Sequence, residues 1–439
     1  MLKNKFQILL ARLKALAGSE KAVERAKSVL IGALILSAAA LFLNSGLAQD
    51  GSSAGSGGQS GSGQQSALSN QTRISLTGPF AIAVTGVDGS HRGIMYDGAE
   101  LSFVYDSMAP YLGEALGSAG APQTVEEAAW RSALGSAGFY FDFSYPQPLS
   151  LIAMSLGVEL TGPASDHTAR RILIASEKNK VNLYYQREKD GLFYRCETEI
   201  SSSSMSARTG DFPSNNASFL FETEYDFPLV DEYFLITEGQ ARLHSVSAQN
   251  PVGTTLDPSA LSGVFGINNY TANKYTESDG TSVYVDGNRI LRISTDGALT
   301  YKNSDQGSGD AIASLKYALD AAQTIVSSTL ARCGGIADYG MSYLGYSQED
   351  NSYTIRFSYE IGGYPVEMGG EYAAEFTVTD GVVTSARLNL REYSYSGDEE
   401  LPLPAVQAMA IVNNKGGGLP LLCYVDNLGS VTVGWAIVE

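Results

Sequence analysis

The stretch that decides the fold is Ala128–Gly157, with the sequence AAWRSALGSAGFYFDFSYPQPLSLIAMSLG. Within it, Phe139–Tyr145 alternates aromatic side chains with small or polar ones, which predicts a strand. The segment AAWRSAL is predicted to form a helix before this strand, and Pro148 opens a second short helix that Gly157 ends. A strand flanked closely by two helices favours an α+β fold, in which helices cover an antiparallel sheet.

Two local patterns in the same half concern its turns and caps. Glu127 follows Thr124 by three residues, which is capping-box spacing, so we expect Thr124 to be the N-cap of the helix that contains AAWRSAL. The serine run Ser201–Ser204 is predicted to be a loop, and no Lys or His lies at a spacing that would activate a serine nucleophile.

The remaining elements of this half follow from apolar spacing and turn signals such as Asp88-Gly89 and Asp190-Gly191. A helix is expected despite Pro110, with a kink or a break near that residue. The predicted ranges are strands at Pro79–Thr85, His91–Tyr96, Arg171–Ser176, Val181–Arg187 and Leu192–Glu197, and a helix at Leu101–Leu116.

The second half repeats the mixture of strands and helices. Its predicted helices are Pro258–Phe265, Asp310–Arg332 and Pro404–Asn413, and its predicted strands are Ser282–Val285, Arg289–Ser294, Ala298–Lys302, Tyr339–Tyr346, Tyr353–Ile361, Tyr372–Thr379, Val382–Tyr393, Leu421–Asp426 and Thr432–Val438. In the helix Asp310–Arg332, apolar residues that include Leu319 and Val326 recur on one face, so this face is expected to pack on a sheet. We therefore predict two modules of antiparallel sheet covered by helices, at residues 72–253 and 254–439.

The N-terminal residues differ sharply in charge from the rest. The chain has a net charge of −18; seven basic and two acidic residues give residues 1–27 a charge of +5, which leaves −23 for the remainder. Residues 28–48 contain no charge and are long enough to cross a membrane as a helix. The basic flank is expected to stay in the cytosol, so the predicted protein is a single-pass cell-membrane protein with an extracellular C-terminal region. A cleaved signal peptide ending near Ala48 is the alternative.

One face of the predicted membrane helix carries small or polar residues at steps of four, three and four, namely Ala33, Ser37, Ala40 and Asn44. Such a stripe lets two helices approach closely, so it is the predicted partner-binding site; ordinary membrane-helix composition is the alternative. Residues 49–71 are rich in Gly and Ser and are predicted to be a flexible linker. The linker favours regulation by docking over transmission through a rigid rod.

Composition excludes several classes of function. The acidic balance argues against nucleic acid as a partner, because phosphate backbones require a basic face. The chain contains no nucleophile elbow, zinc-protease motif, phosphate-binding loop or dinucleotide fingerprint. We expect no catalytic, cofactor-binding or metal-binding site, although a glycosidase whose two carboxylates are distant in sequence stays open. The three cysteines, Cys196, Cys333 and Cys423, are expected to be buried thiols, with one disulfide possible.

The chain resembles the YycH/YycI family, and the YycH branch in particular. The resemblance lies in the predicted membrane helix before an α+β region, and in the stretches Gly78–Gly86, Ala128–Gly157, Asn182–Thr198 and Phe357–Met368 and the closing strands with Trp435. It implies a non-enzymatic accessory protein that regulates a sensor histidine kinase controlling cell-wall metabolism in Gram-positive bacteria. The implied partners are that kinase and a YycI-like paralogue, reached through membrane helices and extracellular domains. The basic N-terminal segment and the Gly/Ser linker depart from the family pattern.

Two other hypotheses come from different classes of function. The first is a tethered cell-envelope enzyme such as a wall hydrolase, for which two facing carboxylates or a buried hydroxyl–imidazole–carboxylate arrangement would be the sign. The second is an extracellular ligand-sensing domain, which a closed apolar pocket would indicate.

Overall fold

The structure is a computed structural model that describes residues 78–96, 98–225, 230–238, 241–305, 314–336, 339–414, 419–427 and 429–438. These residues belong to one compact unit. The predicted membrane helix with its stripe and the predicted linker lie outside the described residues. Among the helices that are described, none is both long and apolar enough to span a bilayer.

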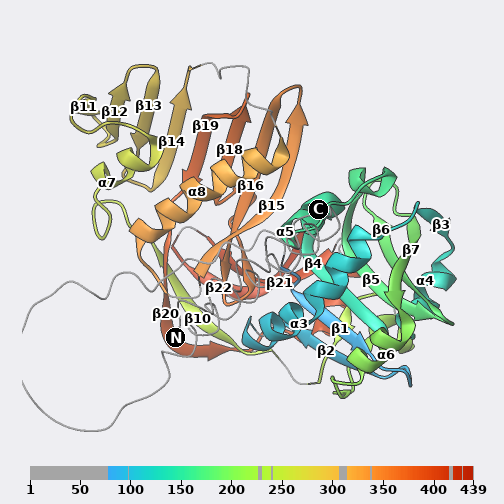
Figure 1. Cartoon of the computed structure of the whole chain (residues 1–439). Coiled ribbons are helices and arrows are strands. Elements are labelled where there is room, and N and C mark those ends of the chain that lie inside the picture. The colour runs from blue at the N-terminus through green and yellow to red at the C-terminus, as the bar shows by residue number, and fades with distance from the viewer. Residues whose placement is uncertain are drawn as a thin grey trace, which may run out of the picture. The chain divides into compact units, whose positions relative to one another are not determined.

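The aromatic strand predicted from FYFDFSY lies inside a seven-stranded antiparallel sheet (Figure 1). The strands, in their order across the sheet, are β2 (His91–Met95), β1 (Ala81–Thr85), β4 (Gly138–Pro148), β5 (Thr168–Glu177), β6 (Lys180–Arg187), β7 (Phe193–Ser201) and β3 (Gln123–Val125). Because side chains alternate along a strand, Phe139 and Phe141 of β4 enter one core cluster while Tyr140 enters another. Both faces of the sheet are therefore buried.

Helices account for the burial of both faces. The cluster around Phe139 and Phe141 includes residues of α3 (Gly98–Gly117), α5 (Leu149–Ser155) and α6 (Ser202–Thr209). The cluster around Tyr140 includes Trp130 of α4 (Glu127–Leu134). The predicted helix is present, but it is not broken at Pro110, which lies inside α3, and the helix continues to Gly117.

Two local predictions in this half are wrong. Thr124 pairs with Tyr194 in the β3–β7 ladder, so its backbone is extended and α4 begins after Glu126 instead. Ser201–Ser204 is not a loop, because α6 begins at Ser202 and the Ser201 side chain accepts a hydrogen bond from the Ser204 amide at 3.5 Å. Strand pairing decides the backbone at Thr124, and burial of Met205 favours the helix after Ser201.

The second large sheet contains eleven strands. In order across the sheet these are β11 (Asn273–Thr276), β12 (Ser282–Asp286), β13 (Arg289–Ile293), β14 (Ala298–Asn303), β19 (Val382–Asn389), β18 (Ala374–Thr379), β16 (Ser352–Ile361), β17 (Tyr364–Glu367), β21 (Leu419–Asp426) and β22 (Val431–Val438), and β15 (Tyr339–Glu349) also pairs with β16. The pairing of β17 with β21 is parallel and the other pairings are antiparallel.

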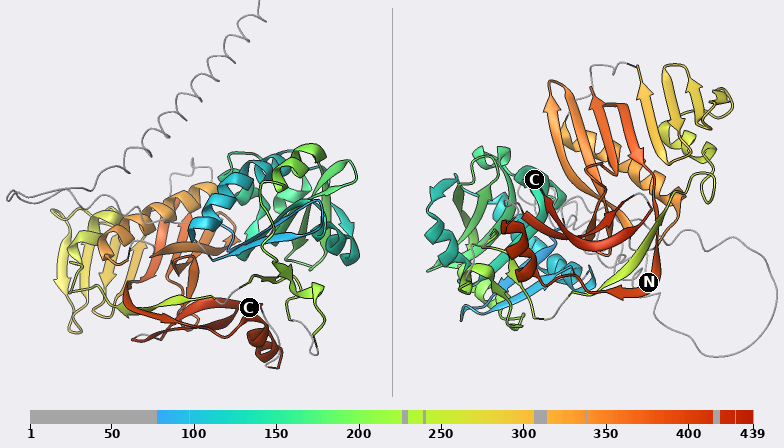
Figure 2. Two further views of the ribbon diagram at one scale, coloured as in Figure 1. Left: turned by 90° about the horizontal axis from the view of Figure 1, so that it is seen from below. Right: turned by 180° about the vertical axis from the view of Figure 1, so that it is seen from behind.

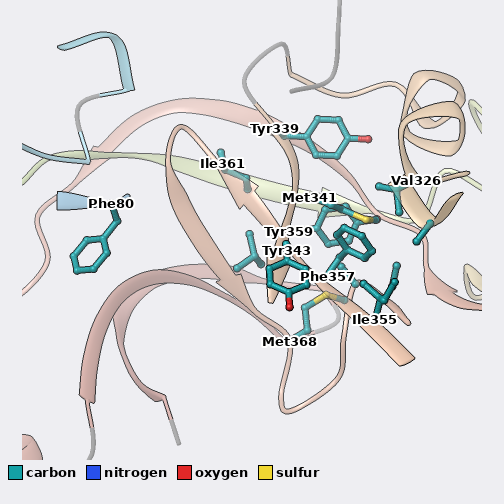
Figure 3. Packing of buried hydrophobic residues seen from close by; sticks show 14 of the residues in the cluster. Phe80, Val326, Tyr339, Met341, Tyr343, Ile355, Phe357, Tyr359, Ile361 and Met368 are labelled. Atoms are coloured by element: carbon teal, nitrogen blue, oxygen red, sulfur yellow. The ribbon is translucent and has the colours of Figure 1, made fainter. Parts of the chain in front are cut away.

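The helix α8 (Leu315–Cys333) crosses this sheet with the predicted apolar face inward (Figure 1). Leu319 and Val326 are almost fully buried, and their cluster contains Ile355 and Phe357 of β16. Figure 3 shows buried side chains of β15 and β16 gathered beside Val326. Within the described residues the helix begins five residues later than predicted, because the Ser314 hydroxyl caps the Tyr317 amide at 3.3 Å.

One predicted strand, Val382–Tyr393, is two strands. The chain leaves the sheet after Asn389, where buried Leu390 donates its amide to the Gly297 carbonyl at 2.9 Å. It then forms β20 (Glu392–Glu400), which pairs with β10 (Leu243–Gln249) as a separate ribbon (Figure 2). Local sequence patterns did not predict β3, β10, β11, β17 or the far end of β20.

The short elements complete the described chain: η1 (Pro163–Asp166), β8 (Ser218–Phe219), η2 (Leu220–Glu222), β9 (Leu235–Ile236), α7 (Ser259–Ser262), η3 (Gly263–Phe265) and α9 (Ala405–Asn414). All strands of the seven-stranded sheet precede residue 254, and all strands of the eleven-stranded sheet follow it. One core cluster nevertheless contains residues from both sides of this boundary, and Tyr96 stacks on Tyr364 with ring centroids 4.5 Å apart. The two-module division at 253/254 stays a prediction.

Candidate functional site

A hollow of about 540 Å³ lies where segments distant in sequence meet; we call it the first hollow. Its walls come from the end of β2, the chain around β9, the segment before α9, and strands β21 and β22. The lining residues are Met95, Tyr96, Phe234, Leu235, Ile236, Thr237, Glu238, Ala241, Arg242, Tyr364, Pro402, Leu403, Pro404, Ala405, Val406, Leu422 and Trp435. Most of them are apolar or aromatic, and the volume falls in the usual range of small-molecule sites.

Tyr96 has two unusual properties in this wall. Its backbone φ is +57°, a left-handed conformation that is uncommon for a bulky residue. Its side chain is 5% exposed, and no group among the described residues accepts its hydroxyl proton. Burial raises the pKa of Tyr96 well above its usual range, so the phenol stays protonated and is a hydrogen-bond donor.

The charged groups of the first hollow are Glu238 and Arg242, one of each sign. A Glu238 oxygen accepts a hydrogen bond from the Asn216 amide at 2.9 Å. The Arg242 guanidinium lies 3.4 Å from a Glu399 oxygen, and both of these side chains are largely exposed. The lining of the first hollow therefore carries no net charge.

A second hollow of about 550 Å³ shares Trp435 and the segment Pro402–Pro404 with the first. The indole N–H of Trp435 donates to the Leu403 carbonyl at 2.9 Å, which holds this segment against β22. The residues lining the second hollow are all uncharged: Leu401, Pro402, Leu403, Pro404, Ala408, Ile411, Val412, Val433, Gly434, Trp435 and Ile437.

Four of the residues around the second hollow are large apolar side chains that are at least two-fifths exposed, namely Leu401, Leu403, Ile411 and Ile437. A contiguous exposed apolar surface is typical of a binding site, whereas scattered apolar residues are not informative. In a chain of net charge −18, an uncharged apolar surface of this kind suits a protein segment that presents apolar side chains.

A buried chain of hydrogen bonds joins a hydroxyl, an imidazole and a carboxylate, the arrangement that an enzyme hypothesis would look for. His91 Nδ1 lies 2.9 Å from the Thr85 hydroxyl, and His91 Nε2 lies 3.1 Å from Glu222. Thr85 is 1% exposed and its hydroxyl donates to the Leu134 carbonyl at 3.1 Å. A hydroxyl so enclosed cannot reach a substrate, and none of the three hollows described here includes these residues.

The position of Glu222 explains what this chain of bonds does. Burial raises the pKa of Glu222, but hydrogen bonds from His91 and from the Phe219 amide together lower it by a larger amount. The resulting pKa is below the usual value. The carboxylate thus stays charged and links η2 to β2. The contact is structural, because it holds the segment that follows α6 against β2, the edge strand of the seven-stranded sheet.

A third, more polar hollow contains two carboxylates, Asp296 and Glu371, with Arg387 and Arg391. Asp296 accepts the Ala298 amide at 3.0 Å in the turn before β14. This hydrogen bond and others lower the pKa of Asp296. A glycosidase needs one carboxyl group with a raised pKa as its general acid, so Asp296 does not suit that role.

The described cysteines and histidines lack the features of reactive or metal-binding groups. The three cysteines are free and buried, as expected, and burial raises the pKa of Cys196 to about 11 and the pKa values of Cys333 and Cys423 to about 12. A nucleophilic cysteine needs a lowered pKa. Within the described ranges, no group of three His, Cys, Asp or Glu side chains has a metal-binding arrangement.

The predicted partner-binding residues, Ala33, Ser37, Ala40 and Asn44, lie outside the described residues, so their role stays a prediction. Tyr96 and the Leu401–Pro404 segment were not identified from the sequence, and Trp435 was noted only as part of a closing strand. The sequence LPLP before an expected helix could have indicated this exposed apolar segment, because leucines between prolines lie outside a helix or strand that would bury them.

No known family profile matches the chain. No curated protein matches its sequence at a significant level. The structure is similar to the crystal structure of YycH from Bacillus subtilis, with a TM-score of 0.51 and 12% sequence identity. The match covers 84% of this chain and 94% of the YycH chain. At this identity the likeness shows a common fold, and the sequence-based resemblance is confirmed at that level.

Proposed function

We propose that this protein is a membrane-anchored extracellular accessory protein that regulates a sensor histidine kinase of a cell-wall-controlling two-component system by protein–protein contact. The single observation that carries the proposal is the YycH-like fold, which spans almost the whole of the YycH chain. In this proposal the N-terminus is cytoplasmic, a single helix crosses the membrane, and the described residues are extracellular. A YycI-like paralogue is a second partner.

The second hollow supports binding as the activity of the extracellular region. Its lining is uncharged and its border carries exposed leucine and isoleucine side chains. Such side chains gain free energy when a partner removes them from water, by about 25 cal/mol per Å² of apolar surface. We infer that an apolar segment of a partner protein docks there, in addition to any contact between membrane helices.

Co-purification tests the proposal. The full chain is solubilised from membranes in mild detergent, and the sensor kinase is expected to be retained with it. Ile411→Lys places a charge in the second hollow and is expected to reduce retention several-fold. Gln407→Lys, on the same helix but outside the lining of either hollow, is the matched control and is expected to retain the kinase. Failure of the wild-type chain to retain any sensor kinase would contradict the proposal.

The predicted membrane stripe is tested in the same assay. Ser37→Ile holds a partner helix away and is expected to weaken association without abolishing it, because the linker lets the extracellular region dock. Leu41→Ile changes the opposite face and is expected to be silent. Equal retention of the kinase by both variants would mean that the stripe is not a contact.

A further inference from the structure

We propose that the partner segment that docks in the second hollow is an extended strand, which pairs antiparallel with the outer edge of β22. Apolar side chains at alternate positions of this strand lie over the second hollow, and a basic residue follows them at the end nearest Glu400. The inference rests on the proposed docking of a partner protein in this hollow. It adds the conformation and the chemistry of the segment that docks.

The strand β22 is at one edge of the eleven-stranded sheet. It pairs with β21 on one side, and no described strand pairs with it on the other. The Val433 amide donates to a Glu400 carboxylate oxygen at 3.4 Å, so this N–H points away from β21. Backbone groups of alternate residues point to the same side of a strand, so those of Trp435 and Ile437 also face outward. Among the described residues, no group forms a hydrogen bond with the backbone of Trp435 or Ile437 on this side.

The composition of β22 differs from that of the strand at the opposite edge of the sheet. β22 has the sequence VTVGWAIV, which contains neither a charged residue nor a proline. β11, at the other end of the strand order, is four residues long and carries Lys274. Short length and a lysine hinder the pairing of an edge with another chain, and β22 has neither protection. Its outward backbone groups identify an extended strand as the occupant, because a strand matches such a row of donors and acceptors.

The second hollow supplies positions for the side chains of the added strand. Val433, Trp435 and Ile437 all line the hollow, so the face of β22 that carries them borders it. In an antiparallel pair, residues opposite each other have their side chains on the same face. The residues paired with Trp435 and Ile437 therefore direct their side chains towards the hollow, beside exposed Leu401 and Ile411. Because the lining is uncharged, these side chains are apolar.

Charge favours a strand of a partner protein over a second copy of this chain. Each copy has a net charge of −18, so two copies repel each other. At the Val433 end of the edge lies Glu400, and the adjacent Glu399 lies 3.4 Å from the Arg242 guanidinium. Two carboxylates and one guanidinium leave one negative charge at this end. A basic residue after the apolar positions of the added strand complements that charge.

A synthetic peptide tests the backbone pairing. The probe is Lys-Val-Thr-Val-Thr-Val-Lys, labelled with fluorescein at its N-terminus and amidated at its C-terminus, and the full chain is kept in detergent micelles. In the proposed antiparallel pair, the valines direct their side chains to the hollow and their N–H groups to β22. N-methylation of the valines is expected to weaken binding at least tenfold, whereas N-methylation of the threonines is expected to leave it unchanged. Fluorescence anisotropy measures the Kd.

Variants of the chain locate the site. Ile437→Lys places a charge on the edge and is expected to weaken binding of the peptide at least tenfold. Ile290→Lys is the matched control, because Ile290 is 40% exposed against 41% for Ile437 and lies on β13, which is paired on both sides. This variant is expected to bind the peptide as the wild type does. The bound peptide is expected to slow hydrogen exchange at the amides of β22 and to leave those of β11 unchanged.

The ends of the peptide test the charge. The C-terminal end of an antiparallel strand lies at Val433, so replacement of the C-terminal lysine by glutamate is expected to weaken binding about threefold more than the same change at the N-terminal lysine. Equal effects of the two replacements would overturn the assigned basic residue.

Several results would overturn the strand. Absence of saturable binding, or equal binding of the two N-methylated peptides, would contradict strand pairing, and selective loss on methylation of the threonines would contradict the antiparallel orientation. Sedimentation that shows a dimer of the full chain, dissociated by Ile437→Lys but not by Ile290→Lys, would assign the edge to a second copy instead. Retention of the kinase by a wild-type chain that does not bind the peptide would overturn the strand alone. Binding of the peptide by a chain that retains no kinase would overturn only the proposed kinase partner.

Discussion

Two regions of this molecule bury polar groups, and they do so in opposite ways. In the seven-stranded sheet, Asp142 accepts from Arg170 at 2.7 Å and from Arg171 at 3.2 Å, and Arg171 also bonds to Asp231. In the first hollow, the Tyr96 hydroxyl is equally buried, yet its proton has no acceptor among the described residues. The difference separates a network in which each charged group has a partner of opposite sign from a hydroxyl whose proton has no acceptor.

The electrostatics of the Asp142 network agree with a structural role. Burial by itself would lower the pKa of Arg171, but the neighbouring charges of Asp231 and Asp142 raise it well above its usual value. The Arg171 guanidinium is therefore held in its charged form by the carboxylates beside it. Removal of Asp142 leaves the buried Arg170 without its carboxylate, and leaving a buried charge unpaired costs more than the pair contributes.

The largest expected effect on stability comes from breaking this network. Asp142→Ala leaves Arg170 and Arg171 without their shared carboxylate and is expected to lower the free energy of unfolding by about 3–5 kcal/mol. Urea denaturation measures the change. Glu197→Ala, which removes a surface partner 2.8 Å from Lys180, is the control and is expected to change stability little. A small effect of Asp142→Ala would mean that the network is dispensable for folding.

The next prediction compares a packed apolar residue with one that borders a hollow. Leu319→Ala on α8 is expected to cost about 2–4 kcal/mol, and Val326→Ala less, because both side chains are buried against the eleven-stranded sheet. Ile411→Ala in α9 is expected to change stability much less, since Ile411 is 44% exposed. Equal costs for Leu319→Ala and Ile411→Ala would show that the second hollow is part of the core.

The third prediction concerns pH. The pKa of Glu222 is lowered in the folded protein. Its charged contact with His91 therefore stabilises the fold fully at pH values above the usual glutamate pKa of about 4.3. This contribution is lost as pH falls through the lowered pKa. Glu222→Gln is expected to be less stable than wild type at pH 6, with the difference shrinking as pH falls below the usual glutamate pKa. Thermal unfolding at a series of pH values measures it, and a difference that grows towards low pH would contradict this sign.

The smallest expected effect sharpens the contrast most. Tyr96→Phe removes a hydroxyl whose proton has no acceptor, so the free energy of unfolding is expected to change by no more than about 0.5 kcal/mol or to rise slightly. Chemical denaturation provides the value. A loss above about 1 kcal/mol would show that the fold depends on the hydroxyl, through the backbone hydrogen bond that Leu422 makes to it.

Local patterns in the sequence determined much of the secondary structure. Alternation in FYFDFSY gave β4, and apolar spacing in α8 gave the buried face with Leu319 and Val326. Both depend only on a strand period of two or a helix period of 3.6, so neighbouring residues carry all the information. The α+β class and the three buried free cysteines follow from the same kind of local reasoning.

Tertiary structure alone decided the break at Leu390, the extended backbone at Thr124 and the candidate site. The first hollow joins residues near 95, 235, 364, 403 and 435, which nothing in their local sequences places together. Thr124 is extended because Tyr194 pairs with it, and the chain leaves the sheet at Leu390 because its amide donates to the Gly297 carbonyl. In each case the deciding partner belongs to another segment of the chain. The sequence could therefore predict which residues are buried. Where the buried residues leave a hollow between them is determined only by the packing of segments that are distant in sequence.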